Sequence, residues 1–252
     1  MDAREGKPRT AGRDGAHRVT RAVILAAGRG ARLAPLTDRV PKPLVPVNGV
    51  PIIATILDAL HAAGISSITI VRGYCGAAFD TLREEYPHLT FLDNPDWERA
   101  NNISSIALAG RAGLLADSYV IEGDLYLANP AIVTSTQERT NYIAFPVEVT
   151  DDWCFDVDAA GKITHIDTAS DHPCHQMLGL SYWTAQDGAR LAACANALYA
   201  EERYHQLYWD EIMLKYFPHE CDVYIRECTR ADVWEIDTVE ELRALEERMR
   251  GV

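Results

Sequence analysis

The amino-acid sequence predicts an α/β protein with a mostly parallel central sheet, helices on both faces and a small β-rich extension. Apolar strand-like runs alternate with helical segments over residues 22–122, a pattern typical of parallel sheets. From about residue 141 the pattern changes to short successive strands. The chain has 252 residues, of which 48% are hydrophobic. This length favours one domain, residues 21–252, over two independent ones.

The first half contains strands that alternate with helices. Pro51 stands at the first turn of one helix and Gly64 ends it. Ligands of such sheets bind at the carboxyl ends of the strands, so we expect Gly28, Gly73 and Asp124 to gather there. The expected strands lie near 22–27, 67–72, 89–92 and 118–122, and the helices near 51–63, 76–86 and 103–112.

The second half is expected to extend the sheet and then to end in helices. Residues 141–184 form the predicted extension, with strands near 141–149, 152–157, 161–166 and 177–183. Helices near 185–200 and 209–217 follow, then strands near 221–226 and 233–236 and a terminal helix at 238–249. Residues 1–20 are polar, Arg-rich and without periodicity, and we interpret them as a disordered tail.

Composition excludes several classes of protein. A net charge of −13 and a pI near 5.0 argue against nucleic-acid binding, so any anion site must be a local basic pocket. The six cysteines form no C-x-x-C pair and no zinc spacing, which favours reduced thiols. No apolar run reaches the roughly 18 residues needed to span a membrane. These observations favour a protein of the cytoplasm.

A glycine-rich turn follows the first strand and indicates a phosphate site. Gly28 and Gly30 let a phosphate approach the backbone, whose N–H groups can point at the anion. Arg32 and Lys42 add positive charge, which suits a nucleoside triphosphate that loses pyrophosphate. A dinucleotide fingerprint fails because Leu33 replaces its third glycine, and a Walker A loop fails because Lys42 stands between prolines.

Two carboxylates follow predicted strands and could hold Mg²⁺ beside a triphosphate. Asp124 follows the run Tyr119–Gly123, and Asp237 ends the strand that contains Trp234 and Glu235. An alternative role for Asp237 is the N-cap of the terminal helix, because D-T-V-E-E precedes an apolar run. Glu122 should point to the opposite face from its strand neighbours and therefore ranks below Asp124.

The chain resembles a known family through residues 25–44. They match the motif L-x-A-G-x-G-x-R-x-x-P-L-T-x-x-x-P-K-P-L of sugar-phosphate and alcohol-phosphate nucleotidyltransferases. Within that superfamily the chain is most similar to bacterial CTP:phosphocholine cytidylyltransferases and 2-aminoethylphosphonate cytidylyltransferases. The segments that carry this narrower resemblance are NNISS at 101–105, YVIEGDLYL at 119–127, LGLSYW at 178–183, LYWDEI at 207–212 and WEIDTVEEL at 234–242.

The resemblance implies a Rossmann-like fold, a Mg²⁺ cofactor and a set of nucleotide-binding residues. It places Asp124 and Asp237 on the metal, with Glu235 as a third candidate. Arg32 is the candidate for the β- and γ-phosphates, and Lys42 for the α-phosphate or the acceptor phosphate. The residues expected to bind the nucleotide are Ala26, Ala27, Gly28, Gly30, Gly73, Asn101, Asn102 and Ser104.

The acceptor pocket is expected to combine aromatic and acidic side chains. Aromatic faces bind quaternary ammonium by cation–π attraction, whereas a primary ammonium donates N–H bonds to carboxylates. An all-aromatic cage would therefore favour phosphocholine, and an acid-rich pocket 2-aminoethylphosphonate. Core packing is the alternative role for each aromatic residue. The candidates are Trp153, Tyr182, Trp183, Tyr208, Trp209 and Asp210, with Asp151, Asp152 and Asp156 as further acids.

The sequence therefore predicts a Mg²⁺-dependent cytidylyltransferase that moves CMP from CTP to phosphocholine or a related aminoalkyl phosphate or phosphonate. A 2-aminoethylphosphonate cytidylyltransferase, a sugar-1-phosphate nucleotidyltransferase and a non-catalytic nucleotide-binding regulator are the alternatives. His172 and His175 have the residue types of a metal site but lack a fourth ligand at a standard spacing. We expect no nucleic-acid or membrane partner, and the sequence leaves a homodimer open.

Overall fold

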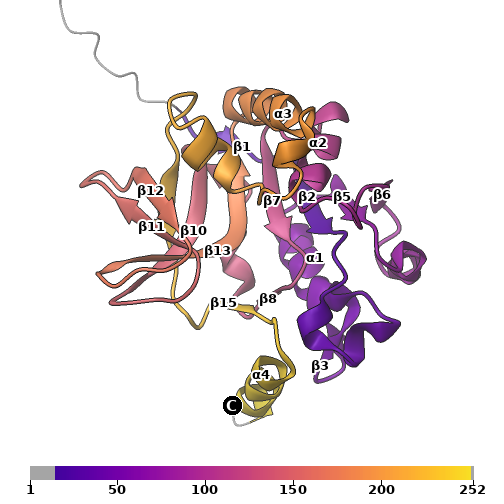
Figure 1. Ribbon diagram of the computed structural model, residues 1–252. Helices are drawn as coiled ribbons and strands as arrows, with labels where there is room; N and C mark the ends of the chain where they lie inside the picture. The colour runs from indigo at the N-terminus through magenta and orange to yellow at the C-terminus, as the bar shows by residue number, and fades with distance from the viewer. Residues whose placement is uncertain (1–14, 251–252) are drawn as a thin grey trace, which may run out of the picture.

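A nine-stranded mixed sheet organises the molecule, and a computed structural model describes residues 15–250 of it. The strand order is β12-β11-β13-β7-β2-β5-β6, and β10 pairs with both β13 and β14 (Figure 1). The predicted α/β class is confirmed.

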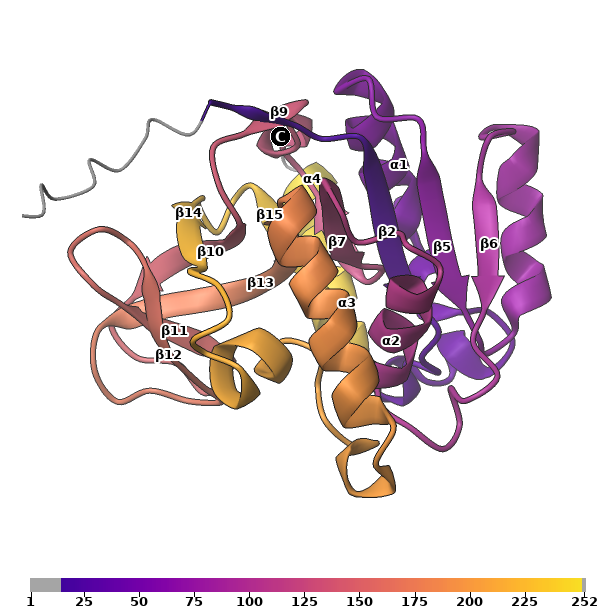
Figure 2. The same ribbon diagram turned by 90° about the horizontal axis from the view of Figure 1, so that it is seen from above.

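The parallel part of the sheet consists of β6 (Thr90–Asp93), β5 (Ile68–Arg72), β2 (Arg21–Ala26) and β7 (Ser118–Glu122). Its strands are almost continuously apolar because helices cover both faces. Ile24 packs in one core with α1 (Ile52–Ala62), and Val23 packs in the other with α2 (Ile103–Arg111) and α3 (Ala185–Tyr199). Figure 2 shows α1 on one side of the sheet and α2 with α3 on the other.

The predicted extension continues the same sheet. Tyr182 of β13 stands opposite Tyr119 of β7, so β13 joins the extension to the parallel strands in antiparallel register. The neighbouring strand β14 runs parallel to β10. The strands of this region are β10 (Asn141–Val147), β11 (Cys154–Val157), β12 (Ile163–Asp167), β13 (Cys174–Trp183) and β14 (Tyr224–Glu227).

A separate two-stranded pair joins two distant segments beneath the sheet edge. β8 (Leu125–Leu127) pairs antiparallel with β15 (Val233–Glu235), and Leu125 stands opposite Glu235. The pair packs on a third apolar cluster that includes Leu33, Tyr126 and residues of α4 (Val239–Arg250). This cluster ties the C-terminal segment to the back of the glycine-rich turn.

Two predicted α-helices take other helical forms. Residues 76–86 form a 3₁₀ stretch, Gly76–Glu84, entered from Cys75 in the left-handed region at φ 47°. The segment near 209–217 contains a π-helical turn, Ile212–Tyr216, closed by a bond from the Phe217 N–H to the Ile212 carbonyl. Such turns are rare and often lie near functional sites.

Ordered structure begins before residue 21. β1 (His17–Arg18) pairs with β9 (Thr136–Gln137), and Val19 is 3% exposed, so the predicted tail extends too far. Its remaining part, residues 1–14, lies outside the described residues. The hairpin β3 (Pro46–Val47) and β4 (Val50–Pro51) and the 3₁₀ turns Ala31–Leu33, Leu36–Asp38, Lys42–Leu44, Pro130–Ile132 and Glu202–Tyr204 complete the elements.

Within residues 15–250, none of the helices is both long enough and apolar enough to cross a membrane.

Candidate active site

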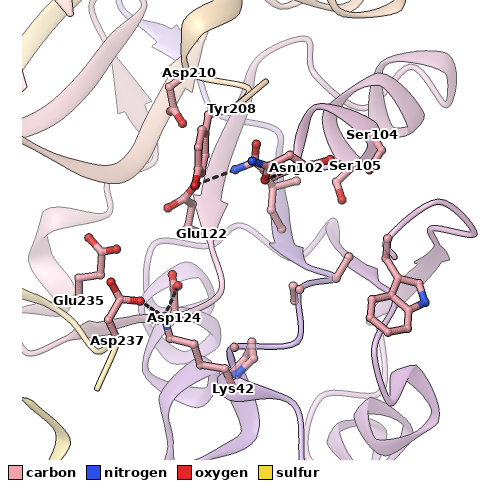
Figure 3. A pocket seen from close by; sticks show the side chains of 18 of the residues that line it. Lys42, Asn102, Ser104, Ser105, Glu122, Asp124, Tyr208, Asp210, Glu235 and Asp237 are labelled. Atoms are coloured by element: carbon pink, nitrogen blue, oxygen red, sulfur yellow. Dashed lines mark hydrogen bonds and ion pairs between the residues drawn. The ribbon is translucent and has the colours of Figure 1, made fainter. Parts of the chain in front are cut away.

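A cavity of about 550 Å³ opens at the carboxyl ends of the parallel strands. Its wall divides into three parts, as Figure 3 shows. The charged cluster comprises Arg32, Lys42, Asp124, Glu235 and Asp237; the acidic corner comprises Glu122, Asp152, Trp153, Tyr208 and Asp210; and the uncharged corner comprises Asn94, Trp97, Ala100, Asn101, Ser104 and Ser105.

Lys42 joins two carboxylates in the charged cluster. Its Nζ lies 2.6 Å from Oδ2 of Asp124 and 2.5 Å from Oδ1 of Asp237. Arg32 contacts the other oxygen of Asp237 at 2.9 Å, and its side chain is 72% exposed toward the cavity mouth. Burial alone would lower the pKa of Lys42, but Asp124 and Asp237 outweigh burial and raise it above the ordinary value. The ammonium is therefore permanently charged.

Gly30 makes room for Lys42. It adopts φ 63°, and a Cβ added there would lie 2.7 Å from the Cβ of Lys42. Any side chain would have to displace the lysine stem, besides the strain of the left-handed backbone. The hydroxyl of Thr37 donates to the Gly30 carbonyl at 2.9 Å and holds the turn. This glycine thus serves the lysine directly, a role that the motif alone does not reveal.

The carboxylate of Asp237 is not a helix cap. Thr238 and Glu241 form the capping box of α4, in which the Glu241 N–H donates to Thr238 Oγ1 at 3.2 Å. In return Glu241 Oε2 accepts from the Thr238 N–H at 2.8 Å and from the Asp237 N–H at 2.7 Å. Asp237 is thereby left to face the cavity, where it contacts Lys42 and Arg32.

Asp124, Glu235 and Asp237 form a group that fits a divalent cation. One oxygen from each lies within 4.8 Å of the others. The second oxygen of Asp124, Oδ1, is buried without a hydrogen-bond partner among the described residues. Burial, together with Asp124 and Asp237, raises the pKa of Glu235 to about 8. A hard cation such as Mg²⁺ binds carboxylate oxygens. It would give the buried Asp124 oxygen a partner and would offset the repulsion among the three carboxylates.

The acidic corner is built around Glu122, the last residue of β7. Its Oε1 accepts from Asn102 Nδ2 at 3.3 Å and from the Trp209 indole N–H at 3.4 Å. Its Oε2 lies over Gly179, where an added Cβ would come within 2.5 Å of it. Strand alternation holds here, because Ile121 packs in one core and Val120 in the other. Glu122 lies on the side of Val120, where it contacts Trp209, and it still lines the cavity, so its low rank is corrected.

Asp210 is the second buried acid of this corner. It is 3% exposed, and its Oδ1 accepts from the Tyr142 hydroxyl at 3.0 Å. Burial raises the pKa of Asp210 to about 7, and burial with Asp210 nearby raises the pKa of Glu122 well above its ordinary value. Of the described residues that line the whole cavity, Arg32 and Lys42 are the basic ones, and both belong to the charged cluster.

Two of the five residues of the acidic corner are aromatic. Trp153 and Tyr208 meet edge to face with ring centroids 5.4 Å apart, and Tyr208 is 45% exposed. Tyr182 and Trp183 are corrected to core residues, because they lie in opposite cores and are 0% and 1% exposed. Trp209, 1% exposed, stands behind the wall and contacts two lining residues, Glu122 through its indole N–H and Asn102 through its backbone N–H.

The uncharged corner holds a hydrogen-bonded group on α2 and the preceding segment. Asn94 donates from Nδ2 to Ser104 Oγ at 2.9 Å and to Ser105 Oγ at 3.0 Å. Trp97 supplies a ring to the wall. The prediction that Gly73 lines the cavity is wrong. Gly73 packs against Trp97 instead, and an added Cβ would lie 2.6 Å from Cβ and Cγ of that residue.

The other residues expected from the sequence line the cavity, although their roles remain predictions. These are Ala26, Ala27, Gly28, Gly30, Arg32, Lys42, Asn101, Asn102, Ser104, Asp124, Trp153, Tyr208, Asp210, Glu235 and Asp237. His172 pairs instead with Asp156 and Asp171, outside the cavity. Sequence reasoning missed Asn94, Trp97, Ser105 and Met177, and only the polar run after the 90–93 strand could have pointed to the first two.

The family of the chain follows from comparison with known proteins. The MobA-like NTP transferase domain matches residues 22–151, slightly more than half of the chain. That segment contains the glycine-rich turn, Lys42 and Asp124. The chain therefore belongs to the nucleotidyltransferase family and is an enzyme of that class.

Similar proteins share nearly the whole length of the chain. It is 37% identical over 228 residues to a 2-aminoethylphosphonate cytidylyltransferase of Lancefieldella rimae, covering 90% of this chain and 92% of the relative. It is 33% identical over 232 residues to a choline-phosphate cytidylyltransferase of Streptococcus pneumoniae, covering 92% and 99%. The solved structure of the pneumococcal CTP:phosphocholine cytidylyltransferase LicC matches with a TM-score of 0.84 at 33% identity, covering 92% of this chain and 99% of that one.

Proposed function

We propose that this enzyme is a Mg²⁺-dependent cytidylyltransferase that transfers CMP from CTP to 2-aminoethylphosphonate and releases pyrophosphate. The observation that carries the choice of acceptor is the acidic corner, which contains three carboxylates and no basic residue among the described lining residues. Both relatives are named as cytidylyltransferases, which supports CTP as the donor.

The charged cluster supports the transfer step. A phosphonate oxygen attacks the α-phosphorus of CTP, the bond from that phosphorus to the bridging oxygen breaks, and pyrophosphate leaves with its electron pair. Lys42 and Arg32 neutralise charge on the phosphates as it shifts toward the leaving group. No general base is needed, because the attacking oxygen is already an anion. Positioning and electrostatics therefore account for the catalysis.

Asp124, Glu235 and Asp237 would hold the Mg²⁺. When bound, the metal supplies Lewis-acid stabilisation of negative charge on the phosphates. Lys42 contacts two of these three acids, so its ammonium would stand beside the residues that hold the metal. The unpartnered Asp124 Oδ1 is the atom that gains most from a metal ligand role.

The acidic corner supports an acceptor with N–H donors. A primary ammonium can donate up to three hydrogen bonds, and Glu122 and Asp210 offer carboxylate oxygens to receive them. Trimethylammonium donates none, so it would form no hydrogen bond with either carboxylate. Because Tyr182 and Trp183 lie in the cores, the chain does not offer the all-aromatic cage that would favour phosphocholine.

Phosphocholine is the second candidate, and the Trp153–Tyr208 pair favours it. Two ring faces and the nearby negative charge would attract a quaternary ammonium. A sugar phosphate is disfavoured because an uncharged sugar would leave three carboxylates at that end of the cavity without a cation.

A pyrophosphate-release assay tests the proposal. The purified protein is supplied with CTP, Mg²⁺ and either 2-aminoethylphosphonate or phosphocholine at equal concentrations, with an EDTA control. Faster release with the aminophosphonate, abolished by EDTA, is the expected result. Faster release with phosphocholine would reassign the acceptor, and release with neither would overturn the proposal.

A further inference from the structure

We propose that the hydroxyl of Ser105 reads the nucleobase, by donating a hydrogen bond to N3 of cytosine. The inference rests on the proposed use of CTP and names the residue that discriminates CTP from UTP. Ser105 is 2% exposed and lies in the wall of the cavity, on the first turn of α2.

The uncharged corner is the part of the cavity that suits a base. The charged cluster takes the triphosphate, and the acidic corner repels it. The segment from Asn94 to Ser105 lines the remaining wall with amides, hydroxyls and the Trp97 ring, and without a charged side chain. An aromatic ring beside fixed polar groups is how proteins bind single bases.

The orientation of Asn94 is fixed by its neighbours. Its Oδ1 accepts from the Asp96 N–H at 2.9 Å, so its Nδ2 must face the two serines. Both N–H bonds of that amide are donated, one to Ser104 Oγ and one to Ser105 Oγ. Each serine oxygen is therefore an acceptor toward Asn94, and each hydroxyl proton must point elsewhere.

The two serines then differ in where the proton goes. Ser104 donates to the Asn101 carbonyl at 2.8 Å, so its hydroxyl is fully used. Ser105 has no acceptor for its proton among the described residues, although its oxygen is bonded to Asn94. The hydroxyl proton of Ser105 therefore points into the cavity. A buried hydroxyl held as a donor requires an acceptor on the ligand.

A fixed donor can distinguish the two pyrimidines at one atom. N3 of cytosine carries a lone pair and accepts, whereas N3 of uracil carries a hydrogen and donates. Two donors would face each other with UTP, and the buried hydroxyl would be left unpaired. The amide of Asn94 sets this polarity, which makes Asn94 a positioning residue for Ser105.

Calorimetric binding of CTP and UTP to the full-length protein with Mg²⁺ and no acceptor tests the inference. The wild type is expected to bind CTP at least about tenfold more tightly than UTP. Ser105→Ala should weaken CTP binding about tenfold and UTP binding less than about threefold. Ser104→Ala is the matched control, and it should leave the ratio of the two affinities near the wild-type value.

Asn94→Asp provides a second, independent variant. A carboxylate accepts where the amide donated, so the Ser105 proton turns toward residue 94 and a lone pair faces the base. UTP should then bind more tightly than it binds to the wild type, which removal of the hydroxyl alone does not predict. Equal losses for both nucleotides in Ser105→Ala, or an unchanged ratio in both variants, would overturn the inference. Because binding is measured without turnover, failure of the proposed reaction would be recognised separately.

Discussion

The charged cluster and the acidic corner lie in one cavity but are assembled in different ways. Lys42, Arg32 and the glycine-rich turn come from one short stretch after β2, and β8 pairing with β15 adds the carboxylates. The acidic corner instead needs the end of β7, the start of α2, Gly179 of β13 and the segment 208–210. Residues that come from one stretch leave a motif, whereas a corner built from several separate segments leaves isolated residues.

The hydrogen bonds of Asn102 show how the dispersed corner is held together. Its Nδ2 donates to Glu122, and its Oδ1 accepts from the Trp209 N–H at 2.8 Å. One side chain thus connects the end of a strand to the segment that carries Tyr208 and Asp210. The comparison predicts that changes in the charged cluster stop the reaction, while changes in the acidic corner alter the choice of acceptor.

The largest expected effect is that of Asp124→Ala. Loss of a carboxylate that contacts Lys42 and would hold the metal should lower kcat by about 10³-fold or more with every acceptor. Pyrophosphate release measures it, and an unchanged circular dichroism spectrum is the control for folding. Full activity in this variant would remove Asp124 from the proposed metal site.

Glu122→Gln should act on the acceptor instead. Replacing the carboxylate by an amide should lower kcat/KM for 2-aminoethylphosphonate about 100-fold through loss of a charge-assisted bond. For phosphocholine the loss should stay below about tenfold. Asp152→Asn is the matched control, because Asp152 already accepts locally from the Trp153 N–H and from Gln176. Equal losses for both acceptors would place Glu122 outside the recognition of the amine.

The sequence predicts the charged cluster better than the acidic corner. The strand–turn motif identified Lys42 and Arg32 because backbone geometry there is local. The sequence predicts Tyr182 and Trp183 at the acceptor, yet adjacent residues of a strand face opposite sides, and an apolar core lies on each side of β13. The same alternation places Glu122 opposite to Ile121, but it does not reveal that this side opens into the cavity at the end of β7. The positions of Tyr182, Trp183 and Glu122 depend on how β13 pairs with β7, which the sequence does not reveal.

Trp183→Ala and Tyr208→Ala should separate the core aromatics from the cavity aromatics. Trp183 is 1% exposed and donates to Ser181 at 2.9 Å, so truncation should lower the free energy of unfolding by about 3–5 kcal/mol. Tyr208 is 45% exposed, and its truncation should cost less than about 1 kcal/mol while it raises the KM of the acceptor. Urea unfolding measures both, and a destabilisation of similar size in the two variants would contradict the assignment.

A further expected effect is a pH dependence of stability caused by Asp210. Its pKa is about 7 in the fold and near 4 in the unfolded chain, so between these values the folded state binds one more proton. The free energy of unfolding should therefore fall as pH rises from about 4 to 7, by at most about 1.4 kcal/mol per pH unit. Asp210→Asn should make this slope shallower in unfolding curves recorded without ligand, because Glu122 and Glu235, whose pKa values are also raised, keep their own contributions. An identical slope in both proteins would contradict the prediction.

The most direct test of the central claim is a methylation series of the acceptor. kcat/KM is measured with CTP and Mg²⁺ for 2-aminoethylphosphonate and for its N-methyl, N,N-dimethyl and N,N,N-trimethyl derivatives. Each methyl group removes one N–H donor while the positive charge remains. If Glu122 and Asp210 recognise the ammonium, kcat/KM falls with each methyl group. A rise toward the trimethyl compound would show that the Trp153–Tyr208 pair, and not the acids, selects the acceptor.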